Sequence, residues 1–177
     1  MKGASLTLLL FLLACADDDP DVRAPRPAAP DTVVRDTAGP TTVTLHFTRG
    51  EVPVPVTRTL GGGTASLQAV LAAQLEGPTD AERASGLTSW FSAATAGLLR
   101  SATVDAGGRA IVDFENLAAV IPSASSSTGS AMLLGELNRT IFQHPEVRTI
   151  EYRSEGSCEA FWNWLQYDCQ VVSRPAP

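Results

Sequence analysis

The chain has 177 residues, of which 44% are hydrophobic and 18% charged, and its formal net charge is -6. This is the composition of a globular protein, and the length suits one ordinary domain. The only lysine is Lys2, so the part from Cys15 onward carries 12 Arg against 19 Asp and Glu. An acidic chain without a basic run has no electrostatic footprint for phosphate backbones, so we expect no nucleic-acid partner.

The N-terminal residues 1–14 have the pattern of a secretory signal peptide. Their apolar run, residues 6–14, would cover only about 14 Å as a helix, which is too short to span a bilayer. The run ends in Leu12-Leu13-Ala14-Cys15, which resembles the lipobox of bacterial lipoproteins. We therefore expect cleavage before Cys15 and acylation of its thiol and freed amine, which would anchor the protein without a membrane span. The alternative is an ordinary signal peptide with a cysteine near its cleavage site.

Residues 15–41 are predicted to be a tether that starts at the lipidated cysteine. They carry five prolines among Ala, Arg and Asp, and they show no strand-like or helical apolar period. Prolines favour extended polyproline II geometry, so the segment could hold a folded part up to about 80 Å from a membrane. A generic exported linker has the same composition, and we favour that interpretation over a spacer of tuned length.

The first expected element of ordered structure is a strand over residues 42–48, which alternate and are rich in β-branched side chains. Residues 52–60 form a second extended run. Pro53 and Pro55 lack amide donors, so this run belongs at a sheet edge or in a loop. Gly61–Gly63 then interrupt the pattern and are interpreted as a hinge.

A helix is predicted over residues 66–76, because four apolar residues recur there at helical spacing. Gly77-Pro78 ends it, and residues 79–85 form a short extra turn. Two segments, residues 98–105 and 109–114, flank a glycine-containing turn and are predicted to form a hairpin.

The polar, Ser-rich segment of residues 123–130 is expected to be a loop that leads into a second helix over residues 130–143. Residues 147–152 are the last predicted strand. The order strand, strand, helix, hairpin, helix, strand predicts an α+β fold, with a small mixed sheet and two main helices packed on one of its faces.

The segment that follows the first helix resembles a known signature. Leu75-Glu76-Gly77-Pro78-Thr79, then Glu82, then Gly86-Leu87-Thr88-Ser89 are similar to the central signature of the GerMN domain, the sporulation and spore-germination family. The other predicted elements come in the order that this family has, including a proline-containing turn at residues 144–147. The resemblance covers about residues 42–153.

This resemblance implies an extracytoplasmic domain, often lipid-anchored, in envelope or sporulation proteins. Some members of the family resemble the ring-building modules of secretion systems, in which side-by-side packing of copies is the function. The resemblance carries no catalytic residue over to this chain. Two features depart from the family: Trp90-Phe91 stand where an apolar residue and a proline are common, and residues 154–177 add a tail.

Few residues are candidates for chemistry. We expect His46 to face solvent and His144 to interact with the last carbonyls of a helix, and neither has a partner at ligand spacing for a metal site. The segment of residues 123–130 lacks the Gly-x-Ser-x-Gly elbow, so a helix cap is favoured over an anion site. Asp113 and Glu115 share a strand face and could do acid–base work, but a hydrated strand edge explains them equally well. We expect no enzyme and no cofactor.

The tail contains two of the three cysteines. If lipid occupies Cys15, then Cys158 and Cys169 remain, and such a pair in an exported protein most simply forms a disulfide. A continuous helix would hold their Cα atoms about 16 Å apart, so the chain must reverse between them. Four aromatic residues in this loop either close one end of the core or leave a patch that binds a partner. They are Phe161, Trp162, Trp164 and Tyr167.

The sequence therefore predicts an envelope lipoprotein with a non-catalytic interaction or assembly module. It would associate with further copies or with another exported protein, on the outer membrane if the source has two membranes. The alternative is a small-ligand-binding or hydrolytic surface lipoprotein, in which the Ser-rich loop and Gly61–Gly63 line a pocket.

Overall fold

The computed structural model describes residues 39–62 and 65–176. The predicted signal peptide, Cys15 and residues 15–38 of the predicted tether lie outside the described residues. Among the helices that are described, none is long and apolar enough to cross a membrane.

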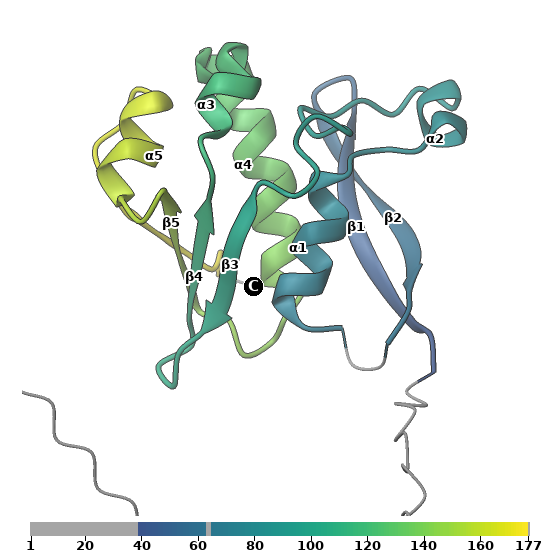
Figure 1. Cartoon of the computed structure of the whole chain (residues 1–177), viewed down its shortest axis with the longest axis horizontal. Coiled ribbons are helices and arrows are strands. Elements are labelled where there is room, and N and C mark those ends of the chain that lie inside the picture. Colours follow the sequence, from purple (N-terminus) through teal and green to yellow (C-terminus); the bar gives the residue numbers. More distant parts are fainter. Residues whose placement is uncertain (1–38, 63–64, 177) are drawn as a thin grey trace, which may run out of the picture. The chain divides into compact units, whose positions relative to one another are not determined.

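The described part has the predicted α+β class, with strands and helices interspersed along the chain (Figure 1). The elements are β1 (Thr41–Arg49), β2 (Val52–Leu60), α1 (Leu67–Leu75), α2 (Asp80–Ala84), β3 (Leu99–Val104), β4 (Arg109–Phe114), α3 (Leu117–Val120), the 3-10 helix η1 (Pro122–Ser125), α4 (Ser127–Phe142), β5 (Thr149–Ser154), α5 (Cys158–Trp164) and β6 (Val171–Ser173).

The described strands form two sheets. β1 and β2 make an antiparallel hairpin, and the other sheet has the order β3-β4-β5-β6, in which β4 and β5 run parallel and the outer pairs are antiparallel. Helices α1 and α4 lie between this four-stranded sheet and the hairpin (Figure 1). The prediction of two main helices on one face of a mixed sheet therefore holds for the four-stranded sheet, but the first two strands do not join it.

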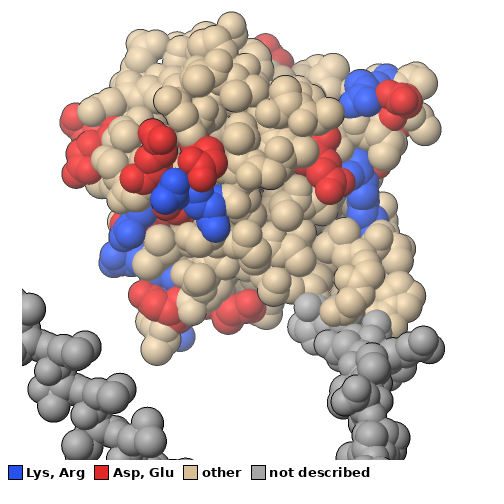
Figure 2. All heavy atoms as spheres, viewed as in Figure 1, with Lys and Arg blue, Asp and Glu red and all other residues tan. Residues whose placement is uncertain are grey.

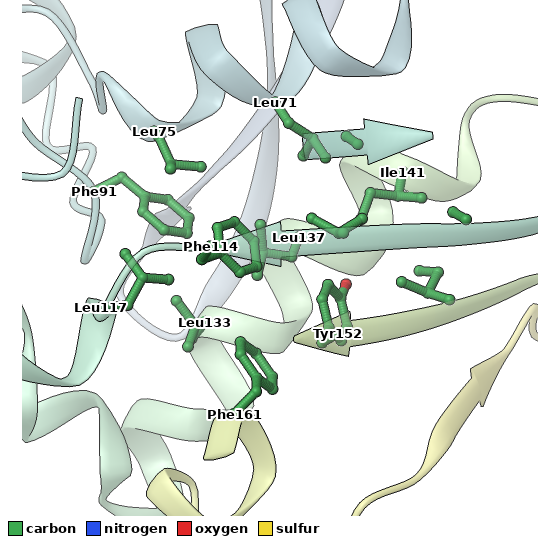
Figure 3. Close-up of a cluster of buried hydrophobic side chains, with 14 of the residues drawn as sticks. Leu71, Leu75, Phe91, Phe114, Leu117, Leu133, Leu137, Ile141, Tyr152 and Phe161 are labelled. Atoms are coloured by element: carbon green, nitrogen blue, oxygen red, sulfur yellow. The ribbon is translucent and has the colours of Figure 1, made fainter. Parts of the chain in front are cut away.

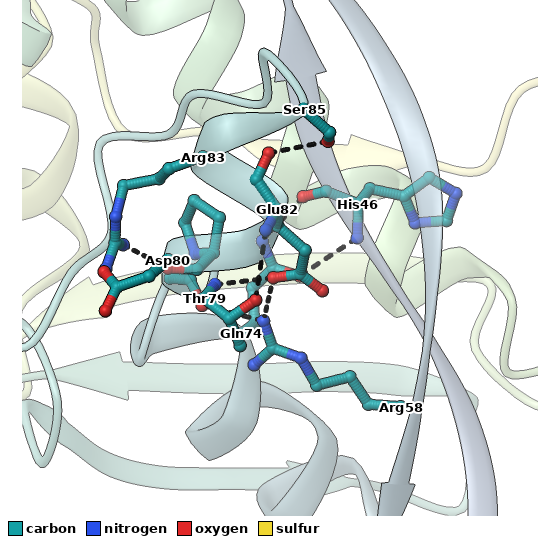
Figure 4. A network of polar contacts seen from close by, with 10 residues as sticks. His46, Arg58, Gln74, Thr79, Asp80, Glu82, Arg83 and Ser85 are labelled. Carbon is teal, nitrogen blue, oxygen red and sulfur yellow. Dashed lines mark hydrogen bonds and ion pairs between the residues drawn. The ribbon is translucent and has the colours of Figure 1, made fainter.

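Helix α1 lies between the two sheets and hydrogen-bonds to a strand edge of each. Gln68 Oε1 accepts a hydrogen bond from the Ala102 N–H of β3 at 2.6 Å. On the other side, Gln74 Oε1 accepts from the His46 N–H of β1 at 3.1 Å, and Gln74 Nε2 donates to the His46 carbonyl at 2.7 Å (Figure 4). Each glutamine satisfies backbone groups at a strand edge, which would otherwise be costly to bury. These contacts close the edges of β1 and β3, which lie in separate sheets.

The register of the hairpin explains its two prolines. Pro55 lies opposite His46 and Pro53 lies opposite Thr48. Both β1 residues direct their backbone groups away from β2, toward α1 and the segment after α2. In an antiparallel ladder the opposite residues do the same, so the two prolines face outward and their missing N–H groups cost no ladder bond. β2 is thus an edge strand, as its prolines predicted.

The main core lies between the four-stranded sheet and the helices (Figure 3). Alternate residues of β4 and β5 enter it, among them Phe114 and Tyr152, and leucines of α1 and α4 cover them. Tyr152 and Phe161 stack with ring centroids 5.0 Å apart. A smaller apolar cluster joins β1 to α1; its buried members are Val43, Leu45, Phe47, Val70 and Ala73.

The second main helix begins earlier than the sequence predicted. α4 starts at Ser127 and not at Ser130, because Ser126 is its N-cap and accepts a hydrogen bond from the Gly129 N–H at 3.1 Å. The rest of the predicted Ser-rich loop is the 3-10 helix η1. α3 and β6 were not predicted, since four-residue and three-residue elements carry no readable periodicity.

Candidate functional site

The first part of the signature, residues 75–82, shapes the turn between α1 and α2. Gly77 has φ +74° and passes so close to Phe91 that an added Cβ would lie 2.1 Å from its carbonyl oxygen. Only glycine fits there. Thr79 then caps α2 and forms a capping box with Glu82. These signature residues have structural roles.

Glu82 also connects this turn to the hairpin. Its Oε2 accepts from the Thr79 N–H at 2.6 Å and forms an ion pair with Arg58 of β2, which also donates to the Gly77 carbonyl at 3.0 Å (Figure 4). Partial burial raises the pKa of the Glu82 carboxyl group, but the bonds from Thr79 and Arg58 outweigh it and hold the pKa below its usual value. The ionised pair thus ties β2 to α2.

The last part of the signature binds both β1 and α4. Thr48 and Thr88 form an isolated antiparallel bridge, with N–H to carbonyl distances of 2.9 and 2.8 Å. The next residue, Ser89, donates from its hydroxyl to Glu136 Oε2 at 2.6 Å, and Glu136 Oε1 lies 3.2 Å from Thr48 Oγ1. One carboxyl group therefore connects three segments that are distant in the sequence.

Glu136 is the residue here that sequence reasoning missed. It is completely buried, and this burial raises its pKa to about 8 against the opposing effect of hydrogen bonds from Ser89 and Thr48. A signal was available: Glu136 immediately precedes Leu137 and follows Leu133 by three positions, so it lies beside the apolar stripe of α4. A buried neutral carboxyl group can donate and accept hydrogen bonds, which suits a structural contact.

The two carboxylates once considered for acid–base work form ion pairs. A bulge in β3 between Leu99 and Ser101 inserts Arg100. Arg100 Nε lies 3.1 Å from Asp113 Oδ2, and its Nη1 lies 3.1 Å from Glu115 Oε1. Both carboxylates therefore have a structural partner. The expected hydrated strand edge is wrong for Asp113, because β4 lies between β3 and β5 and this side chain is only 14% exposed. Figure 2 shows one group of charged side chains on the side of β3 to β5 and another on the side of α2 and β2.

The two histidines lie differently from what was expected. His46 is half-buried and not solvent-facing, because β1 also packs on α4. The Nδ1 atom of His46 lies 3.3 Å from Thr140 Oγ1. Burial and, to a smaller extent, the charge of Arg139 lower the pKa of His46. The His144 ring lies 3.4 Å from Glu146, and it is Arg174 that binds the carbonyls at the end of α4. Among the described residues, no group of three or more His, Cys, Asp or Glu could hold a metal ion.

The segments assigned to a ligand pocket do not come together. The beginning of α4, at Ser127 and Thr128, borders a hollow of about 380 Å³ with Glu51 and Pro53 near the hairpin turn. Gly61 follows the far end of β2, roughly 30 Å away along a nine-residue strand. Gly63 lies outside the described residues. The Ser-rich segment and the glycines that are described therefore cannot line one pocket.

Cys158 and Cys169 form a disulfide, and their Cα atoms are 5.5 Å apart. α5 occupies the first part of the loop, and the chain reverses after it. Phe161 and Trp162 are buried and belong to the core, so neither presents a contact surface. Trp164 is half-buried against that core, and only Tyr167 of the four aromatic residues is exposed. The core alternative therefore holds for most of this loop, because α5 buries Phe161 and Trp162 and the following residue, Leu165, is buried with them.

The outer side of α4 is open between the hairpin and the C-terminal segment. One hollow of about 380 Å³ lies beside Ala131 and Met132, and another of about 430 Å³ lies beside Gly135, Phe142 and Pro175. A third, of about 210 Å³, is lined by Thr88, Ser89, Trp90 and Met132.

One of two similar known structures supports the fold. The tandem GerMN domains of the sporulation protein GerM from Bacillus subtilis match with a TM-score of 0.51 and 20% identity, over 81% of this chain and 48% of that chain. This chain thus spans about half the length of that structure. A crystal structure of a candidate lipoprotein from Clostridium perfringens matches with a TM-score of 0.41 and 15% identity, over 81% of this chain and 93% of that chain. No curated protein matches.

A family model settles the relationship that the signature predicted. The model described as "Sporulation and spore germination" (Germane) matches residues 36–157, which is more than half of the chain. The family is not a known enzyme family. The resemblance to the GerMN domain is confirmed, and the chain belongs to the sporulation and spore germination family.

Proposed function

We propose that this protein is an envelope lipoprotein, held at a membrane by lipid on Cys15, whose domain is a non-catalytic interaction and assembly module. The supporting observation is that the candidate reactive side chains are engaged in structural contacts. Asp113 and Glu115 pair with Arg100, Glu136 is buried, and the signature residues form caps and bridges. These contacts stabilise the fold and leave no described carboxylate pair free for acid–base work at the site.

The outer side of α4 is the surface that we assign to the partner. Its half-buried residues Met132 and Phe142 lie beside hollows that the hairpin and the C-terminal segment border. Apolar side chains at the centre of a surface with a polar rim are typical of protein interfaces. The partner is a further copy of this chain or another exported protein.

Sedimentation velocity of residues 36–177, which form one compact unit, tests the assembly. We expect association that increases with protein concentration and is abolished by Met132→Glu on α4. The matched control is Ala84→Glu on α2, where an exposed residue far from α4 receives the same charge. A strictly monomeric domain, together with no protein cross-linked to it in the native envelope, would refute the proposal.

The lipid anchor has its own test. Cells that express the full chain are labelled with a palmitate analogue, and the label is expected on the wild-type protein and not on Cys15→Ser. Label that persists in the variant, or is absent from the wild type, would contradict the anchor while leaving the interaction module untouched.

A further inference from the structure

Glu136 lies where three parts of the fold meet. It comes from the middle of α4, and its carboxyl oxygens contact Ser89 of the signature segment at 2.6 Å and Thr48 of β1 at 3.2 Å. The hairpin shares no backbone ladder with the four-stranded sheet. Its attachment to the rest of the domain therefore depends on side chains and on the Thr48–Thr88 bridge, which lies beside this carboxyl group.

Within the described part of the chain, no cation compensates a charge on Glu136. The charged or titratable groups on the elements around it are Arg139 on α4, His46 and Arg49 on β1, and Arg58 on β2, and none of them forms an ion pair with Glu136. The signature segment contributes only hydroxyl groups there. His46 carries little charge near neutral pH, because burial lowers its pKa. An ionised Glu136 would thus be a buried, unpaired carboxylate, which is costly.

The neutral form fits the hydrogen bonds around it. Thr48 Oγ1 has one proton and two acceptors within reach, the Thr88 carbonyl at 2.8 Å and Glu136 Oε1 at 3.2 Å. When that proton goes to the Thr88 carbonyl, a neutral Glu136 can keep the contact by donating its own O–H to Thr48. The Ser89 hydroxyl donates to the other carboxyl oxygen and accepts from the Phe91 N–H at 3.0 Å. After loss of the carboxyl proton, Glu136 Oε1 and the Thr88 carbonyl compete for the one Thr48 proton, which can satisfy only one of them.

We propose that Glu136 is a proton-dependent latch: its neutral carboxyl group holds the hairpin and the signature segment on α4, and loss of the proton loosens them. The main core is not affected, because its aromatic and aliphatic packing does not involve this group. The proposed latch does not depend on the proposed function. If α4 binds a partner, however, the latch also links acidity to that surface, because the hairpin turn borders the hollow beside Met132.

Amide hydrogen exchange tests the latch. The protection of the Thr48 and Thr88 N–H groups, corrected for intrinsic exchange, is measured from about pH 5 to about pH 9. An opened hairpin exposes Glu136 with its ordinary pKa of 4.5, whereas the closed form holds the pKa at about 8. We therefore expect protection to fall about tenfold per pH unit between these values and then to level off.

Two variants and one direct measurement decide the outcome. Glu136→Gln should show no such fall, whereas Glu51→Gln, which removes an exposed carboxyl group on the hairpin turn, should behave like the wild type. The titration of the Glu136 carboxyl carbon by NMR should have its midpoint near pH 8 in the wild type. A midpoint near 4.5, or the same fall of protection in Glu136→Gln, would overturn the latch. The titration needs no variant, so the test survives if Glu136→Gln does not fold.

Discussion

The β1–β2 hairpin and the C-terminal segment 158–176 flank the same core but are attached to it by different forces. The hairpin lies within the family match, and polar contacts from Gln74, Thr88 and Glu136 join it to the domain beside a small apolar cluster. The C-terminal segment lies just beyond the match, yet it contributes fully buried aromatic rings and a disulfide. The family boundary in sequence is therefore not the boundary of the folded core.

The largest effect should come from the segment beyond the match. Trp162 is 1% exposed and contacts the rings of Tyr152 and Phe161. Its indole N–H has no hydrogen-bond partner among the described residues, so Trp162→Ala loses packing alone. We expect a loss of about 3–5 kcal/mol in the free energy of unfolding, measured by urea denaturation. A loss below about 1 kcal/mol would mean that the tail is not part of the core.

The pH dependence of stability should come from the hairpin side. The pKa of Glu136 is about 8 in the folded protein against an ordinary 4.5. Below about pH 4.5, Glu136 is protonated in both the folded and the unfolded protein. Between about pH 4.5 and pH 8 only the unfolded chain loses this proton, so the free energy of unfolding falls by a few kcal/mol as the pH rises. Above about pH 8 the fall ends, because the folded protein loses the proton as well.

Thermal unfolding of the wild type and of Glu136→Gln at matched pH values isolates the contribution of Glu136 to the pH dependence of stability. Carboxylates with lowered pKa values, such as Glu82 and Glu151, lose their stabilising effect at acid pH in both proteins and cancel in the difference. Parallel curves for the two proteins between pH 5 and 8 would contradict the prediction.

The disulfide should contribute about 3 kcal/mol, because it closes a loop with a sequence separation of 11. We expect the double variant Cys158→Ser and Cys169→Ser to be destabilised by that amount under oxidising conditions. Adding a reductant should destabilise the wild type and leave the variant unchanged. Equal stability of the two proteins without reductant would show that the bond does not stabilise the tail.

The smallest effect should come from the glutamines of α1, and it should be local. Gln74→Ala leaves the His46 carbonyl without this partner and the His46 N–H with Thr140 Oγ1 alone. The expected cost is about 1–3 kcal/mol. Gln68→Ala removes one bond to Ala102 and is the matched control on the same helix. We expect faster hydrogen exchange in β1 for the first variant and in β3 for the second. Identical exchange patterns would show that the two edges are not closed independently.

Much of the fold follows from local patterns. The alternation of residues 42–48 and the helical stripe of α1 gave the correct elements, since a period is visible without a partner. The polar contacts do not follow, because their partners lie far apart in sequence: His46 and Gln74 are 28 residues apart, and Thr48 and Glu136 are 88 apart. His46 was expected to face solvent because alternation identifies one packed face of a strand and cannot show that a helix covers the other.

The closed edges of the two sheets bear on how partners can bind. The β1 edge is covered by side chains and a short bridge, the β2 edge carries two outward prolines, the β3 edge lies along α1, and β6 is only three residues long. Such features disfavour the addition of a strand from another molecule. A partner at the proposed interaction surface should therefore recognise side chains on a face of the domain. Docking by backbone pairing, which is also a route to aggregation, is disfavoured.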